Sequence, residues 1–228
     1  MATYSVTANL DPDDFTKVSQ AGYRLCIAKQ VNERYYVVWK SVEDYYQITP
    51  FQWQSEEFQV FGSVKSGRRV EFSTDTPNIK FGETCTLDKN GVMLPAHGPS
   101  EPESGVFHVQ NNFGPIFIGA NAKLLGGDKW LPVYLSDQPC VDGNFDLVPV
   151  EKALIWFDLT SSTCDIIQKP IANCIEVCHS NPICVPTSSE LIILALQVDF
   201  TQSTAPQAVE YTVIDPTNPG EGRWKRIQ

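Results

Sequence analysis

Aromatic side chains are concentrated between Tyr35 and Phe61. The chain has 25 aromatic rings (12 Phe, 8 Tyr and 5 Trp), and this stretch of 27 residues holds nine of them: Tyr35, Tyr36, Trp39, Tyr45, Tyr46, Phe51, Trp53, Phe58 and Phe61. Rigid rings supply large contact areas in ligand pockets, while tyrosine hydroxyls and tryptophan N–H groups orient the bound molecule. A binding site is therefore expected first in this stretch.

Four of these rings are the candidate ligand contacts: Trp39, Tyr45, Tyr46 and Trp53. Pro50 and several Gln and Thr residues interrupt the apolar pattern around them, which favours a loop or a sheet edge that presents rings with polar groups between them. The alternative is a corner of the core, in which the rings pack inward and the tyrosine hydroxyls bond to the backbone. The sequence leaves both interpretations open.

Four of the seven cysteines lie within 21 residues, and a histidine is among them: Cys164, Cys174, Cys178, His179 and Cys184. A structural zinc site uses four N/S ligands, usually in two close pairs, and only Cys174 and Cys178 have that spacing. Cys174, Cys178, His179 and Cys184 are therefore weak metal candidates, and zinc is not the expected cofactor. Disulfides and free thiols are the alternatives.

No catalytic group stands out in the sequence. Nucleophilic catalysis needs a base beside a Ser or Cys, and the three histidines are His97, His108 and His179. Cys178 and His179 are adjacent, so on a strand they would point to opposite faces. Nothing in the sequence singles out one carboxylate pair, such as Glu56 and Glu57, as acid and base, and no glycine-rich phosphate loop is present. The sequence favours a protein that is not an enzyme.

One short helix is predicted near the N-terminus. Asp11 suits the N-cap, Pro12 the first helical position, and Asp13 and Asp14 the positive end of the helix dipole, while Gly22 is a stop signal. We expect this helix to close one end of a sheet.

The rest of the chain has the texture of a β protein. Short alternating or apolar runs are separated by turn-forming pairs such as Ser66-Gly67 and Asn90-Gly91. Strands are expected at 23–31, 34–40, 58–62, 69–73, 78–81, 106–110, 116–118, 133–135, 153–159, 190–200 and 209–214. The pattern predicts an all-β, mainly antiparallel sandwich or barrel-like domain over residues 1–228, with a weaker possible boundary in the proline-rich loop 95–104.

Charge and hydropathy limit the partners. The formal net charge of −10 would repel nucleic acid and an anionic membrane, and no basic stripe with aromatics is present. The N-terminus does not resemble a secretory signal, and no apolar run reaches 18 residues, so we expect a cytosolic protein. A small-molecule ligand is the expected partner, and a homo-oligomer stays open.

Three stretches resemble soluble fruit-body β-proteins of mushrooms, in particular the chromoproteins of that group. They are 58–62 (FQVFG), 78–84 (NIKFGET) and 149–157 (PVEKALIWF). The resemblance implies an intracellular protein that holds a small conjugated pigment without transforming it, which agrees with an aromatic-lined pocket. The alternative is a fruit-body lectin or membrane-active defence protein that uses the same rings on neutral glycans or lipids.

Overall fold

A computed structural model describes residues 2–64, 67–168, 171–173 and 193–227. These residues form mostly strands, with the α-helix α1 (Pro12–Gln20) and the short 3-10 helix η1 (Pro102–Ser104). The strands are β1 (Thr3–Leu10), β2 (Arg24–Val31), β3 (Lys40–Val42), β4 (Ile48–Gln54), β5 (Phe58–Ser63), β6 (Asn78–Ile79), β7 (Thr84–Leu87), β8 (Phe107–Asn111), β9 (Phe117–Lys123), β10 (Trp130–Leu135), β11 (Gly143–Leu147), β12 (Pro149–Asp158), β13 (Ile171–Asn173), β14 (Ile193–Asp199), β15 (Gln207–Thr212) and β16 (Arg223–Ile227).

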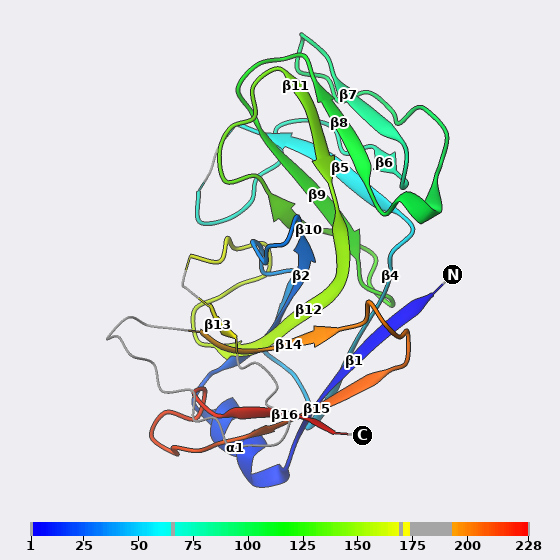
Figure 1. The fold of residues 1–228 in the computed structure, drawn as a ribbon. Coiled ribbons are helices and arrows are strands. Elements are labelled where there is room, and N and C mark those ends of the chain that lie inside the picture. Colours follow the sequence, from blue (N-terminus) through cyan, green and yellow to red (C-terminus); the bar gives the residue numbers. More distant parts are fainter. Residues whose placement is uncertain (1, 65–66, 169–170, 174–192, 228) are drawn as a thin grey trace.

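The strands form four sheets, which we name by one member each. The β1 sheet has the order β16-β15-β1-β4 and the β12 sheet the order β13-β14-β12-β2-β3; both lie in the lower half of Figure 1. The β9 sheet (β10-β9-β5-β6) and the β8 sheet (β11-β8-β7) lie in the upper half. The predicted all-β fold with one short N-terminal α-helix is confirmed, and within the described ranges the sheets stay open rather than closing into a barrel.

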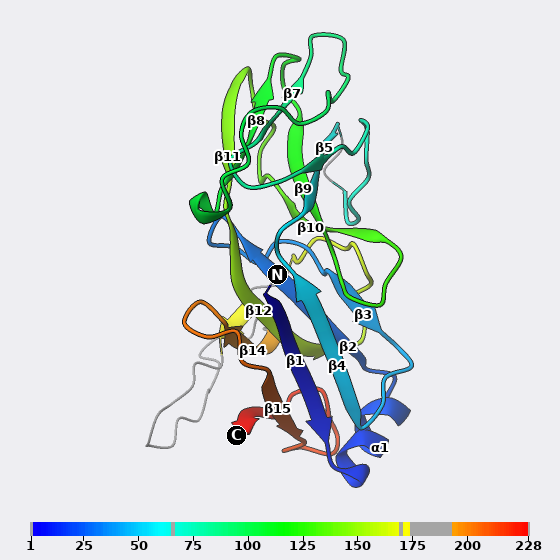
Figure 2. The same cartoon turned by 90° about the vertical axis from the view of Figure 1, so that its right-hand side faces the viewer.

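Two stretches of chain join the halves. β11 and β12 follow each other as one long curved ribbon, and β4 leads up into β5 (Figures 1 and 2). Most strand pairs are antiparallel, while β1 with β15, β7 with β8 and β13 with β14 are parallel. The halves share one buried cluster, which runs from Val6 in β1 through Phe58 and Phe107 to Trp224 in β16. Residues on both sides of the loop 95–104 contribute to this cluster, although the extent of the domain stays a prediction.

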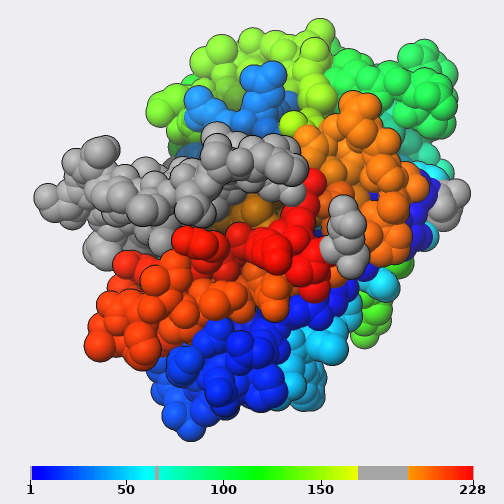
Figure 3. Space-filling view, turned by 60° about the horizontal axis from the view of Figure 1, so that its bottom comes forward, coloured from blue at the N-terminus to red at the C-terminus, as the bar shows by residue number. Residues whose placement is uncertain are grey.

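The predicted helix start is confirmed in detail. The Asp11 carboxylate accepts hydrogen bonds from the backbone N–H groups of Asp13 and Asp14, at 2.8 and 2.9 Å, so it caps the first turn. Val18 is buried and gives α1 an apolar contact with the core. The N-terminal part of the chain, in blue, lies beside the orange and red C-terminal part at this end of the molecule (Figure 3). No helix in the described part of the chain is long and apolar enough to cross a membrane.

Several strands differ from the sequence-based prediction. β1 was not expected as a strand, and the stretch of β4 was expected as a loop or a sheet edge, because Pro50 and the glutamines hide its alternation. In β4, Thr49, Phe51 and Trp53 point inward and Ile48 and Gln52 outward. Pro50 is tolerated because β4 is an edge strand. Conversely, the stretch 69–73 is not a strand; it contributes only an isolated bridge between Arg69 and Asp165.

Candidate functional site

The four predicted ligand contacts do not form one site. Trp39 and Trp53 are buried and meet edge to face, with ring centroids 5.8 Å apart. Tyr45 is also buried but lies in another ring group, against Phe15 of α1. Tyr46 is 75% exposed and points into solvent. The stretch is therefore split between core and surface.

Trp53 is the centre of an inner ring cluster, which we define as Tyr4, Trp39, Trp53 and Phe200. Tyr4 stacks on Trp53 at 5.9 Å, and Phe200 meets it edge to face at 5.4 Å. The alternation of β4 places Trp53 on the inward face, between the β1 sheet and the β12 sheet. These contacts pack Trp53 on several sides as a core residue.

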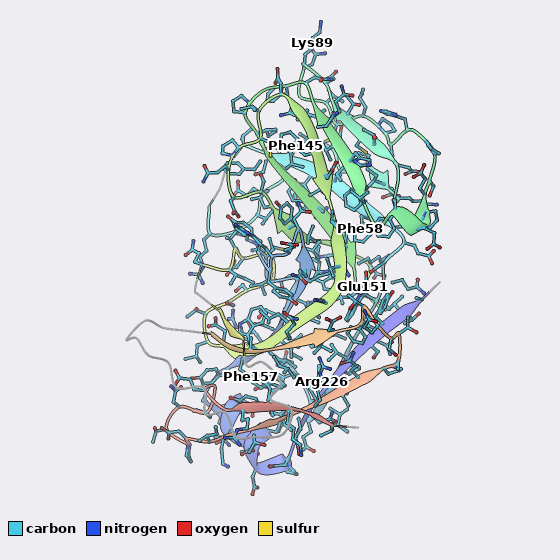
Figure 4. The ribbon with its side chains drawn as sticks, in the orientation of Figure 1. Phe58, Lys89, Phe145, Glu151, Phe157 and Arg226 are labelled. Carbon is cyan, nitrogen blue, oxygen red and sulfur yellow. The ribbon has the colours of Figure 1, made fainter. Side chains whose placement is uncertain are left out.

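A buried lysine lies over this cluster. The Lys29 amine is 5.6 Å from the Trp53 ring centroid and donates to Glu151 Oε2 at 2.9 Å, Ser55 Oγ at 3.2 Å and the Val150 carbonyl at 3.3 Å. Glu151 lies midway along the molecule in Figure 4, below Phe145 and Phe58 and above Phe157. The ion pair therefore joins β2 and β12 to the connection between β4 and β5.

The polar atoms of the inner ring cluster are well supplied with partners. Trp53 Nε1 donates to the same Glu151 oxygen at 2.9 Å, and Trp39 Nε1 donates to the Ala122 carbonyl at 3.4 Å. Burial lowers the pKa of Lys29, while the Glu151 carboxylate acts to raise it. A lysine with three acceptors and two indoles with acceptors form a closed polar network, which is what a structural core requires.

The other face of the β12 sheet carries a second apolar group. We define the outer-face cluster as the buried residues Cys26, Ala28, Val38, Leu154, Trp156 and Ala195, with Tyr35 and Ile167 packed against them. On β12, Ile155 and Phe157 point into the main core, whereas Leu154 and Trp156 point to the outer face. Trp156 is flanked by Cys26 of β2 and Ala195 of β14, both small.

Polar atoms of the outer-face cluster are left without partners. Trp156 Nε1 and the Tyr35 hydroxyl are buried and have no hydrogen-bond partner among the described residues, and the same holds for Gln30 Oε1. Gln30 lies on β2 at the same parity as Cys26 and Ala28, so it belongs to the same face. Burial raises the pKa of Tyr35, with a further contribution from Asp199, so its hydroxyl stays protonated and able to donate.

A pocket adjoins this cluster. It has a volume of about 220 Å³, below the roughly 300–1,000 Å³ of pockets for drug-sized ligands. Its lining residues are Arg68, Asp158, Thr160, Ser161, Asp165, Ile166, Ile167 and Gln168. Ile167 belongs to both the pocket and the outer-face cluster, and Asp158 is two residues beyond Trp156 on the same face of β12. The cluster therefore leads into a polar end.

The polar end of the pocket is held in place by internal bonds. Asp158 accepts from the Thr160 N–H at 2.9 Å, the Thr160 hydroxyl at 3.2 Å and the Ser161 hydroxyl at 2.7 Å. Arg68 donates to the Thr160 carbonyl at 2.6 Å and lies 3.4 Å from Asp165 Oδ2. These bonds fix two buried carboxylates and a guanidinium as a preorganised polar wall.

The sequence of β12 contains a signal for this second apolar face. The run ALIWFD at 153–158 is apolar at both parities, which indicates a strand covered on both sides and thus a second apolar face. The contributions of Tyr35 and Ile167 could not be read, because they depend on the pairing of 36–38 with 164–167 across the fold.

The cysteines are divided by what the structure describes. Cys26, Cys85, Cys140 and Cys164 are free thiols, and burial raises the pKa of Cys26 and Cys85 to about 12. The weak metal candidates Cys174, Cys178, His179 and Cys184 lie outside the described residues. Within the described ranges, no group of three or more His, Cys, Asp or Glu residues is arranged to hold a metal ion.

Comparison with known proteins returned no relative for this chain. No family model, no curated protein and no solved structure matches it.

Proposed function

We propose that this protein holds a small, flat, largely apolar or conjugated ligand, chromophore-like in character, without transforming it. The observation that carries the proposal is the continuity between the outer-face cluster and the 220 Å³ pocket through Ile167. An apolar, ring-containing surface that ends in a few fixed polar groups is the usual make-up of a small-ligand site. The ligand body would lie against Trp156 and Tyr35, with its end toward Asp158.

The polar wall supports holding over catalysis. Three hydrogen bonds from Thr160 and Ser161 hold the Asp158 carboxyl group in one direction, so its oxygens already serve as acceptors within the pocket wall. Ser161 already donates to Asp158 and has no histidine among the lining residues to activate it. The proposal includes a cytosolic location. The net charge of −10 disfavours nucleic acid and an anionic membrane as partners.

Ligand capture from a natural mixture tests this function. Recombinant protein would be incubated with a small-molecule extract of its natural source, separated by gel filtration and analysed by native mass spectrometry and visible absorption. We expect a mass above that of the bare chain, with the added compound released on denaturation. Recovery of the bare chain alone would contradict the proposal.

Matched variants locate the capture. Trp156→Ala and Ile167→Ala should each reduce retention of the compound. Two positions are tested because one of the variants could fail to fold. Tyr46→Ala is the control, because this side chain is 75% exposed and belongs neither to the outer-face cluster nor to the pocket lining. Circular dichroism would establish that each variant is folded.

A second function has one specific observation in its favour. Tyr46 is held on a rigid turn, since the Thr49 hydroxyl accepts from its N–H at 3.0 Å and donates to its carbonyl at 2.9 Å. With Ile48, which is 64% exposed, it offers a small apolar surface for a neutral glycan or lipid headgroup. A glycan array and leakage of phosphatidylcholine–sphingomyelin vesicles, each repeated with Tyr46→Ala, separate this lectin or membrane-active function from ligand holding.

A further inference from the structure

We propose that the ligand of the outer-face cluster bears a hydrogen-bond acceptor within its conjugated system, a carbonyl or a ring oxygen or nitrogen, that is received by Trp156 Nε1–H and the Tyr35 hydroxyl. This inference rests on the proposed function and specifies the chemical class of the ligand. Apolar contacts alone would bind a pure hydrocarbon as well as a ligand that carries an acceptor. The two donors would favour the ligand with the acceptor.

The first step is the cost of an unmade hydrogen bond. A buried donor without a partner destabilises a fold by about 1–3 kcal/mol, so each instance calls for a physical reason. Trp156 is fully buried, and neither its N–H nor the Tyr35 hydroxyl has a partner in the described part of the chain. An acceptor on a bound molecule would supply the missing bonds.

The second step is that this fold satisfies comparable groups elsewhere. The indoles of Trp39 and Trp53 have acceptors, and the hydroxyls of Tyr23 and Tyr211 donate to Asn218 Oδ1 at 2.6 Å and to the Pro219 carbonyl at 2.7 Å. These four ring donors are therefore satisfied within the fold.

Two further ring donors, Tyr45 and Trp224, also lack partners among the described residues. Both belong to the main core, where Tyr45 lies against Phe157 at 5.4 Å and Trp224 stacks on the same ring at 5.5 Å. The outer face differs because its donors share one cluster with each other and with a pocket-lining residue, Ile167. That juxtaposition points to a ligand.

The third step is the chemistry of the two groups. An indole N–H can only donate, so Trp156 requires an acceptor on the ligand, and a neutral phenol can donate its one proton to such an acceptor as well. Gln30 Oε1 on the same face is an acceptor without a partner, which suits a ligand that also carries an N–H or O–H substituent. A ligand without an acceptor would leave both donors as they are.

A matched pair of probes tests the inference. Coumarin and naphthalene share a fused two-ring outline, but only coumarin carries a carbonyl and a ring oxygen. Their affinities would be measured by titration calorimetry for the native chain and for Trp156→Phe and Tyr35→Phe, which keep the ring and remove the donor. Tyr23→Phe is the control, because it removes a tyrosine hydroxyl beside the main core, where it donates to Asn218 Oδ1.

We expect each donor-deleting variant to weaken coumarin binding about two- to tenfold, the usual value of one hydrogen bond, and to leave naphthalene binding unchanged. Two results would overturn the acceptor inference: equal binding of coumarin by the native chain and both variants, or binding of naphthalene but not of coumarin. Either result would still be compatible with the proposed function of holding a small ligand. Binding of neither probe to the native chain would count against the proposed function itself and the inference with it.

Discussion

The two faces of the β12 sheet both carry tryptophan, but they treat its polar atom differently. On the inner face, Trp53 donates to Glu151, and Lys29 completes the network with three acceptors. On the outer face, Trp156 and Tyr35 pack in an apolar cluster without hydrogen-bond partners in the described residues. The comparison teaches that ring density alone does not mark a binding site. On the outer face, the donors without partners in the described part of the chain also share a cluster with Ile167, which lines the pocket.

The largest effect is expected from breaking the inner network. Glu151→Leu would leave the Lys29 ammonium buried without its counter-charge, and loss of one partner of a buried ion pair costs about 3–5 kcal/mol. The free energy of unfolding, from urea titration, should fall by this amount. Lys29→Met combined with Glu151→Leu should recover much of the loss, and a double variant as unstable as the single one would argue against the ion pair as the cause.

Next in size is a matched pair of tryptophan substitutions. Trp53→Phe removes a bond to a carboxylate, whereas Trp156→Phe removes a donor that has no partner in the described residues; hydrogen bonds to charged groups contribute about 1.5–3 kcal/mol. The unfolding free energy should therefore fall more for Trp53→Phe by roughly that difference, because both substitutions remove the same ring atoms. Equal losses would remove the distinction between the two faces.

Prediction from the sequence succeeded where signals were local. The capped helix after Asp11 was found because Asp, Pro and acidic residues define a helix start within a few positions. The turn after β2 was also placed correctly, since Asn32 and Glu33 adopt the left-handed conformation that joins Val31 to Arg34. The strand expected at 34–40 was wrong: Arg34 and Val37 form only isolated bridges, and β3 begins at Lys40. Turn-forming residues between short apolar runs therefore indicated the all-β fold class, and the cap residues indicated the helix.

Prediction failed where position depends on the whole fold. The sequence left open whether Trp53 lies at an exposed edge or in the core, because Pro50 and glutamines surround it. β4 is an edge strand, which admits Pro50, and its alternate residues, Trp53 among them, are buried in the core. Trp39 was assigned to the same site as Tyr46, yet the first is buried and the second is in solvent. Most rings of the stretch 35–61 therefore pack in the core. The candidate site proposed here combines Tyr35, the first residue of that stretch, with Trp156 of β12.

A smaller effect is expected from pH on the inner face. Burial lowers the folded-state pKa of Lys29 below its ordinary 10.5, so between the two values the unfolded chain binds a proton that the folded chain does not. The stability contribution of Lys29 should therefore rise as pH climbs toward 10.5. The measurement is the unfolding free energy of the native chain minus that of Lys29→Met, across alkaline pH.

That subtraction also removes an opposing trend. The Cys26 and Cys85 thiols have folded pKa values of about 12 against an ordinary 9.0, so stability falls above pH 9 in both proteins. A difference that falls with rising pH would contradict the sign given for Lys29.

The smallest effect is expected at Tyr46. Tyr46→Ala should change the unfolding free energy by no more than about 0.5 kcal/mol, the usual range for exposed positions, and should leave coumarin affinity unchanged. Loss of coumarin binding in this variant would move the site to the exposed turn and support the sequence-based choice of Tyr46.

The most direct measurement is the indole N–H resonance of each tryptophan in a ¹H–¹⁵N correlation spectrum, with Trp156 assigned by Trp156→Phe. On addition of coumarin, the Trp156 resonance should shift as its N–H gains an acceptor, while those of Trp53 and Trp39, already bonded to Glu151 and Ala122, should stay in place. A shift of the Trp53 or Trp39 resonance with Trp156 unmoved would contradict the account.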